Sequence, residues 1–260
     1  MLSALVAPFH DPKGILIAKF RQTFPILRKN FPKFFLSITP PTQSAQGEFI
    51  KELKDNPIFS LNFNPEKSLA GDHYLNSFRS AVSQSRPNDY LHLCTADRLT
   101  FILNTKYKNQ FLSDLSWAEK QKNPVLFIRS AKAWKTHSFN YYAAENIATS
   151  AGKLLFKKDL DFAWCHLIIK ASLLKKVLPL VNQHDLSVLA EIIFLVSERA
   201  KIIQKKVDWL SWEDPYVLGV NSLKLKKERE NDPEDNEKRF GYVFPILKFL
   251  FNKFSSRKHN

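Results

Sequence analysis

The chain has 260 residues, of which 44% are hydrophobic and 13% aromatic, so it can build a full core and is not an intrinsically disordered protein. Its formal net charge is +14, which favours anionic partners: nucleic acid, phosphate-bearing small molecules or an anionic lipid surface. The two cysteines, Cys94 and Cys165, have no CxxC spacing, which excludes a thiolate zinc site and a disulfide framework and indicates a reducing compartment.

The first residues, "MLSALVAPFHDP", are apolar but carry neither a basic start nor a small-residue cleavage site. We therefore expect a first strand at residues 2–7 and not a signal peptide. No run of about 18 uncharged apolar residues occurs, so no segment is expected to span a bilayer. Together with the cysteine usage, this pattern predicts a cytoplasmic protein.

Strands and helices alternate along the first half of the chain. Expected helices cover residues 15–31, with a kink or stop at Pro25, and residues 47–56, 73–85 and 98–121. Expected strands cover residues 33–42, 58–64, 89–96 and 124–130. Such alternation predicts an α/β fold with a mostly parallel central sheet and helices on both faces.

The second half changes character. Helices are expected at 138–156 and 184–202, with a helix or partly a strand at 161–181 and a closing strand in 202–219. Residues 224–239 are so rich in charge that a solvated linker is expected. The interpretation is one α/β domain at 1–223, this linker, and a basic, aromatic C-terminal helix at 240–260.

Polar residues follow two of the expected strands. His10 and Asp11 come after the first strand, and Asp97 and Arg98 come after the strand at 89–96. Because ligands of such folds bind beyond the carboxyl ends of the strands, we expect these residues to share one rim. The alternatives are a polar turn at "HDP" and an Asp97–Arg98 ion pair that caps the next helix.

The order of these parts, with "TADR" in mid-chain, an "AEN" helix and a late "WEDP", makes residues 2–220 resemble bacterial proteins with the GT-A glycosyltransferase fold, the nucleotide-diphospho-sugar transferase superfamily. The resemblance implies that the first strand and its loop, with Pro8, His10 and Asp11, hold the nucleotide. It also implies an Asp-x-Asp that holds Mg²⁺ or Mn²⁺ against the diphosphate. Here the motif is Thr95-Ala96-Asp97, with Asp97 as the metal ligand and Arg98 as a phosphate ligand.

Other acids are candidates for proton transfer. Glu213 and Asp214 could supply the base that activates an acceptor in an inverting transferase, or they could hold a turn together. Asp159 and Asp161, with His166 close by, form a second cluster that suits a metal or a base, or else a charged loop before a buried segment. Glu145 in "AAEN" is expected to be a solvated helix residue or a cap partner.

The last segment has an apolar stripe at helical spacing. A helix beginning near Pro245 would align Phe244, Leu247, Leu250, Phe251 and Phe254, with Lys248, Lys253, Arg257 and Lys258 at its edges. Such a helix suits an anionic membrane surface at the inner face of a membrane. The alternative is that the stripe docks on the domain itself or on a partner subunit.

The sequence therefore predicts a glycosyltransferase that binds a nucleotide-sugar donor. The alternative is a non-catalytic relative of that fold, since half of the Asp-x-Asp is absent. Sequence-specific nucleic-acid binding is not expected, because the aromatic residues sit among aliphatic ones as core does. No Walker A, GxGxxG, HExxH or GxSxG sequence occurs.

Overall fold

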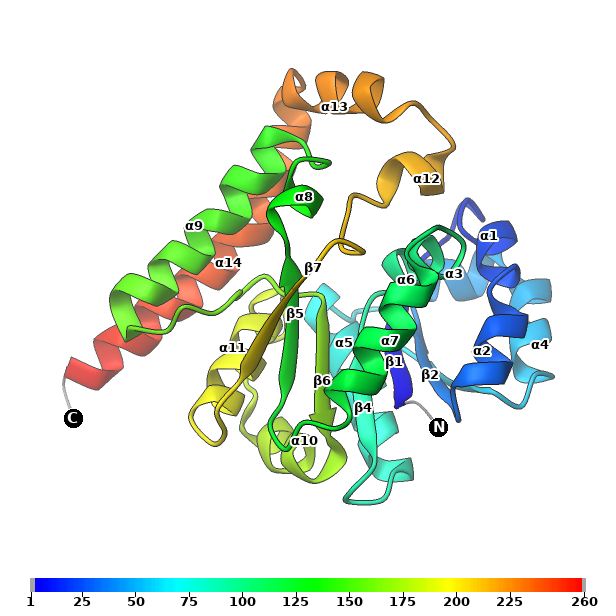
Figure 1. Ribbon diagram of the computed structural model, residues 1–260, viewed down its shortest axis with the longest axis horizontal. Coiled ribbons are helices and arrows are strands. Elements are labelled where there is room, and N and C mark those ends of the chain that lie inside the picture. The colour runs from blue at the N-terminus through cyan, green and yellow to red at the C-terminus, as the bar shows by residue number, and fades with distance from the viewer. Residues whose placement is uncertain (1–2, 259–260) are drawn as a thin grey trace.

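A single seven-stranded sheet forms the centre of the molecule in the computed structural model, which describes residues 3–258 (Figure 1). The strands are β1 (Ala4–Phe9), β2 (Phe34–Ile38), β3 (Phe59–Phe63), β4 (Tyr90–Leu93), β5 (Val125–Arg129), β6 (His166–Lys170) and β7 (Ile203–Val207). Their spatial order is β3-β2-β1-β4-β6-β5-β7. All neighbours are parallel except that β6 is antiparallel to both β4 and β5, which confirms the mostly parallel α/β sheet.

Helices connect the strands and cover the sheet. In chain order they are α1 (Ile17–Arg21), α2 (Phe24–Asn30), α3 (Pro40–Ala45), α4 (Gly47–Lys54), α5 (Ala70–Gln84), α6 (Ala96–Leu103), α7 (Lys108–Ala118), α8 (Ala131–Trp134), α9 (Phe139–Phe156), α10 (Ala171–Val177), the 3₁₀ helix η1 (Leu178–Leu180), α11 (Ser187–Ser197), α12 (Asp214–Leu218), α13 (Ser222–Glu230) and α14 (Pro233–Lys258).

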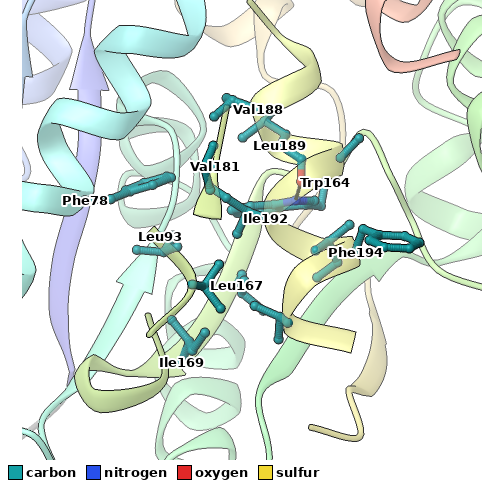
Figure 2. Packing of buried hydrophobic residues seen from close by; sticks show 14 of the residues in the cluster. Phe78, Leu93, Trp164, Leu167, Ile169, Val181, Val188, Leu189, Ile192 and Phe194 are labelled. Carbon is teal, nitrogen blue, oxygen red and sulfur yellow. Dashed lines mark hydrogen bonds between the residues drawn. The ribbon is translucent and has the colours of Figure 1, made fainter. Parts of the chain in front are cut away.

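Alternate strand residues supply two separate cores, one on each face of the sheet. Val6 and Leu93 point to the face covered by α5, α9, α10, α11 and α14, whereas Leu5 and Phe34 point to the face covered by α1, α2, α4, α6 and α7. Figure 2 shows part of the first core, where Trp164, Leu167 and Ile192 pack together. Because both faces are covered, the inner strands β1, β2 and β4 are mostly apolar, whereas the edge strand β7 exposes Gln204 and Lys206.

The chain order creates a crevice at one rim of the sheet. Strands β2 and β3 are added one after the other on one side of β1, and β4 is then added on the other side of β1. At such a reversal the loops after the two central strands diverge and leave room for a ligand. Because β6 is antiparallel, its amino end lies at this same rim, so the residues just before His166 also reach the crevice.

Several expected boundaries need correction. The helix expected at 15–31 is split into α1 and α2, with Pro25 in the first turn of α2, where proline is tolerated. The segment 161–181 is β6 followed by α10, which confirms that it is partly a strand. Residues 224–239 are not a linker but parts of α13 and α14. Of the first strand, residue 2 lies outside the described part.

The C-terminal helix begins earlier than expected, at Pro233, and contains Pro245 in its interior. Its inner face consists of Val243, Ile246, Phe249 and Leu250, which are buried in the core shared with α9 and α11. Phe244 points outward instead. The alternative in which the helix docks on the domain is therefore confirmed, although the side chains of residues 257–260 are not described.

Between residues 3 and 258, no helix combines the length and the apolar character that crossing a membrane requires.

Candidate functional site

A cavity of about 710 Å³ lies at the crevice where β1 and β4 end. Residues from the strand ends, from α9, from the segment before β6 and from α12, α13 and α14 line it. Six of the seven predicted site residues are among them: Pro8, His10, Asp97, Arg98, Glu213 and Asp214. The lining residues therefore come from segments that are far apart in the sequence, from Pro8 near the start of the chain to Ile246 near its end.

Asp11, the seventh, is not part of the lining. It is buried, and its carboxylate accepts hydrogen bonds from the backbone N–H groups of Ile15, Leu16 and Ile17 at 2.9, 2.8 and 3.0 Å. Its own N–H donates to the Thr42 hydroxyl. Since its acceptor capacity goes to the loop before α1, the alternative of a polar turn describes Asp11 better than ligand binding does.

His10 marks the end of the cavity next to β1. Its Nδ1 is 2.8 Å from the Thr39 hydroxyl, at the end of β2. His73 of α5 also lines this end. Burial lowers the pKa of His73, and the nearby His10 lowers it further. This end therefore offers the neutral ring of His73 together with the His10 ring and the Thr39 hydroxyl, which suit hydrogen bonding to a polar group.

Asp97 lies in the first turn of α6 and is half-buried. One carboxylate oxygen, Oδ1, accepts the backbone N–H of Arg98 at 2.8 Å. The alternative of an Asp97–Arg98 ion pair is wrong, because the Arg98 side chain is directed to Glu213 instead. The Asp97 carboxylate faces the cavity.

Arg98 and Glu213 form a buried ion pair in the cavity wall, with Nη1 and Oε2 3.0 Å apart. Their contact does not have hydrogen-bond geometry, and neither atom has another hydrogen-bond partner among the described residues. Burial raises the pKa of Glu213, while the Arg98 guanidinium opposes that rise. Both groups therefore keep hydrogen-bonding capacity for a ligand.

A second buried ion pair lies beside the first. Arg129, the last residue of β5, contacts Glu145 of α9 at 2.5 Å. The Tyr141 hydroxyl joins the two pairs, since it is 2.9 Å from Arg98 Nη2 and 3.1 Å from Arg129 Nη2. Glu145 is thus not a solvated helix residue.

Sequence reasoning missed Arg129 and Tyr141. A signal for Arg129 was available, because it ends a buried strand just as Arg98 follows one, and a charge at that position lies at the ligand-binding rim. Tyr141 offered no comparable signal. It becomes part of the site only because α9 packs over the end of β5.

The possible cluster of Asp159, Asp161 and His166 does not assemble, which favours the alternative of a charged loop before a buried segment. Asp159 is exposed and pairs with Lys153. Asp161 lies closer to the ion pairs, and burial, followed by the Glu145 charge, raises its pKa to about 6. His166 is on the other face of the sheet, where its Nδ1 is 2.9 Å from Nε2 of His92.

The segment expected to be a linker supplies cations to the site. Asp214 pairs with Arg229 of α13 and lies 4.0 Å from Arg239 of α14. The Arg239 guanidinium also stacks over the Tyr141 ring, 4.6 Å from its centroid. Lys238 lines the cavity as well. These charges form one wall of the site because the segment is helical.

Within residues 3–258, no three His, Cys, Asp or Glu side chains are grouped in a way that could hold a metal ion. Asp97 is one carboxylate, so it fits a divalent cation only if phosphate oxygens and water complete the coordination sphere.

Comparison with models of known protein families gave no match, and comparison with curated proteins gave none either.

Proposed function

We propose that the cavity binds a nucleotide-diphospho-sugar and that the protein transfers the sugar to an acceptor hydroxyl. The observation that carries the proposal is the meeting of Asp97, Arg98 and Glu213 with Arg129 in one cavity beyond the carboxyl ends of β1 and β4. The resemblance of the sequence to the nucleotide-diphospho-sugar transferase superfamily supports the same reading.

The guanidinium groups suit the diphosphate. Arginine binds phosphate oxygens through two parallel N–H donors, and the buried Nη1 of Arg98 contacts Glu213 at 3.0 Å without hydrogen-bond geometry. Arg129 lies beside it, joined through Tyr141. A dianionic leaving group placed against these buried guanidinium groups would have its charge stabilised.

Glu213 is the residue we assign as the base. Its carboxylate is buried, and a raised pKa makes a carboxylate a better proton acceptor near neutral pH. It would take the proton of the acceptor hydroxyl as the oxygen attacks the sugar. Asp214 is held by Arg229, so we assign it the role of positioning the α13–α14 wall.

Asp97 is the residue that would hold a Mg²⁺ or Mn²⁺ ion. Such a cation supplies positive charge to the diphosphate as it leaves. Its remaining ligands would be phosphate oxygens and water.

The test is thermal unfolding in the presence of UDP-, GDP-, ADP-, CDP- and TDP-sugars, each with and without Mn²⁺ or Mg²⁺. A ligand that binds only the folded protein raises the melting temperature. We expect one nucleotide to give a metal-dependent rise that is lost in Asp97→Asn. The matched control is Asp55→Asn, since Asp55 is an exposed aspartate outside the cavity lining. No rise with any nucleotide would contradict the proposal.

The second candidate is a non-catalytic binding protein with this fold. The single carboxylate of "TAD" and the closed Arg98–Glu213 pair favour it. The two candidates differ in the Glu213→Gln variant. A transferase loses donor hydrolysis and transfer while its nucleotide-dependent rise in melting temperature remains, whereas a binding protein shows that rise and no turnover before or after the change. We propose a cytoplasmic location for the protein under both candidate functions.

A further inference from the structure

Helices α9 and α14 lie side by side and run in the same direction along one edge of the molecule (Figure 1). Near their starts, Asn140 Nδ2 donates to Asn236 Oδ1 at 2.9 Å. Near their ends, the rings of Phe156 and Phe254 are 5.9 Å apart. The two helices are therefore in contact over most of the length of α9.

Large apolar side chains are exposed on the outer side of this helix pair. On α9 these are Ile147 and Leu154, which are 42% and 73% exposed. They follow Asn140 by seven and fourteen residues and so lie on the same face of the helix as Asn140. Since Asn140 contacts α14, both side chains border α14.

The matching residues on α14 are Phe244 and Phe251, which are 66% and 55% exposed. They are seven residues apart and share a face. Phe254 contacts Phe156 of α9. Phe251 lies three residues before Phe254, so the two phenylalanines are neighbours on the surface of α14. Together, Ile147, Leu154, Phe244 and Phe251 form an apolar strip, which we call the α9–α14 seam.

Lysines flank the seam. Residues 146–158 contain Lys153, Lys157 and Lys158, residues 240–256 contain Lys248 and Lys253, and neither stretch contains an acidic residue. Lys153, Lys157 and Lys248 are exposed. Lys158 and Lys253 are directed toward α11 instead, because Lys158 pairs with Glu198 at 2.8 Å and Lys253 lies over the Phe194 ring. Asp159 offsets Lys153 in part, at 3.5 Å in an exposed pair.

We propose that the α9–α14 seam docks on an anionic lipid bilayer surface, with its four apolar side chains in the interface and Lys153, Lys157 and Lys248 among the headgroups. An apolar strip with basic edges has the chemistry of a peripheral membrane helix. A second copy of the chain would bring lysines against lysines, in a protein whose net charge is +14, and like charges disfavour that contact. The proposal does not depend on the ligand of the cavity.

The experiment is co-sedimentation of the protein with vesicles of phosphatidylcholine alone and of phosphatidylcholine with about one-third phosphatidylglycerol. We expect binding to the anionic vesicles, a reduction of about tenfold or more in the Phe244→Ser/Phe251→Ser variant, and a smaller reduction in Lys153→Gln/Lys157→Gln. The matched control is Ile15→Ser/Leu180→Ser, which changes two side chains of similar exposure, 44% and 42%, outside the seam. It should bind as the unmodified protein does.

Equal melting temperatures of the two serine variants establish that both remain folded. The proposal is overturned if the unmodified protein does not bind the anionic vesicles, if it binds neutral vesicles equally well, or if the seam variant binds as strongly as the control. A dimer in light scattering that becomes a monomer only in the seam variant would assign the seam to a second copy. None of these measurements uses a nucleotide, so their outcome does not depend on whether the cavity binds a nucleotide-sugar.

Discussion

The buried pairs Arg98–Glu213 and Arg129–Glu145 place four charges within one hydrogen-bonded group around Tyr141. Removing a charged side chain from water is costly, and the attraction between partners offsets that cost only while both are present. For stability alone, apolar residues would serve as well. We infer that the charges are kept for a ligand that carries opposite or complementary charge.

Replacement of Arg98 tests how strongly this pair is coupled. In Arg98→Met, Glu213 stays buried without its cation, and we expect a loss of about 3–5 kcal/mol in the free energy of unfolding near neutral pH. A carboxyl whose folded pKa is raised stabilises the fold below its unfolded pKa and loses that contribution as pH rises through the folded value. The loss in Arg98→Met should therefore be smaller at pH 5 than at pH 8. Urea unfolding at the two pH values measures it.

The double variant Arg98→Met/Glu213→Leu is the control, because it removes both charges. It should recover most of the stability lost in the single variant. A double variant as unstable as Arg98→Met, or a loss that does not depend on pH, would show that the pair is not coupled in this way.

His92 and His166 form a different buried pair, on the opposite face of the sheet, among Phe111, Phe127 and Trp209. Burial lowers the pKa of His92 to about 3. Burial, and then His92, lowers that of His166 as well. Both rings are thus neutral in the folded protein at neutral pH.

This pair predicts sensitivity to mild acid. A histidine whose folded pKa is lowered contributes stability above its unfolded pKa, near 6.5, and that contribution is lost as pH falls. Between pH 7 and 5 we expect the free energy of unfolding to fall with a slope approaching about 1.4 kcal/mol per pH unit for each histidine. The His92→Gln/His166→Gln variant should show a clearly smaller slope in urea titrations, and the slope that remains belongs to groups such as His137, whose pKa burial also lowers. An unchanged slope would assign the acid sensitivity to other groups.

At the scale of elements, α5 depends on a close approach of backbone. Gly71 lies in its first turn, and a Cβ there would overlap the carbonyl oxygen of Asp185, in the loop before α11. By contrast, a Cβ on Gly241 in α14 meets nothing within 4 Å. A side chain is therefore sterically excluded at Gly71 but has room at Gly241.

We predict opposite effects of alanine at the two positions. Gly71→Ala should destabilise the protein by about 1–3 kcal/mol because α5 and the loop must separate. Gly241→Ala should stabilise it by about 0.5–1 kcal/mol through helix propensity. Thermal unfolding of both variants measures the difference, and a stabilising Gly71→Ala would contradict this account of the contact.

The elements that could be predicted are those whose signal is local. β1, β2 and β5 are short apolar runs that end in polar loops, and such runs identify strands whatever their neighbours are. The segment 224–239 could not be predicted in the same way. Its helices form in a stretch of mostly charged side chains, and their ties are to α9 and α12, such as Arg229 to Asp214 and Asn140 to Asn236.

The candidate site, too, was predictable where the signal is local and was not where it depends on tertiary contacts. The rule that ligands bind at the carboxyl ends of strands placed Asp97, Arg98 and His10 at one cavity without knowledge of the packing. It could not tell that Arg98 reaches Glu213, because that contact joins segments separated by more than a hundred residues. Nor could it place Asp161, which comes to the rim only because β6 runs antiparallel to its neighbours.

On the scale of the whole molecule, the charge of +14 must act on any polyanion. We expect binding to random single-stranded oligonucleotides at about 0.05 M salt and its loss at about 0.2 M, because such binding releases counterions. Fluorescence anisotropy with two unrelated sequences measures it. Tight binding at the higher salt with a preference for one sequence would show that the protein recognises nucleic acid specifically.

The position of α14 in the chain has a consequence for how the protein is made. This helix follows every other described element, yet it supplies Val243 and Ile246 to the core and to the wall of the cavity. While the chain is still being translated, the earlier elements can fold in order, but α9 and α11 leave the apolar faces that α14 later covers open to water. A nascent chain therefore has no finished ligand site, and until α14 emerges it presents to chaperones the surface that becomes the interior.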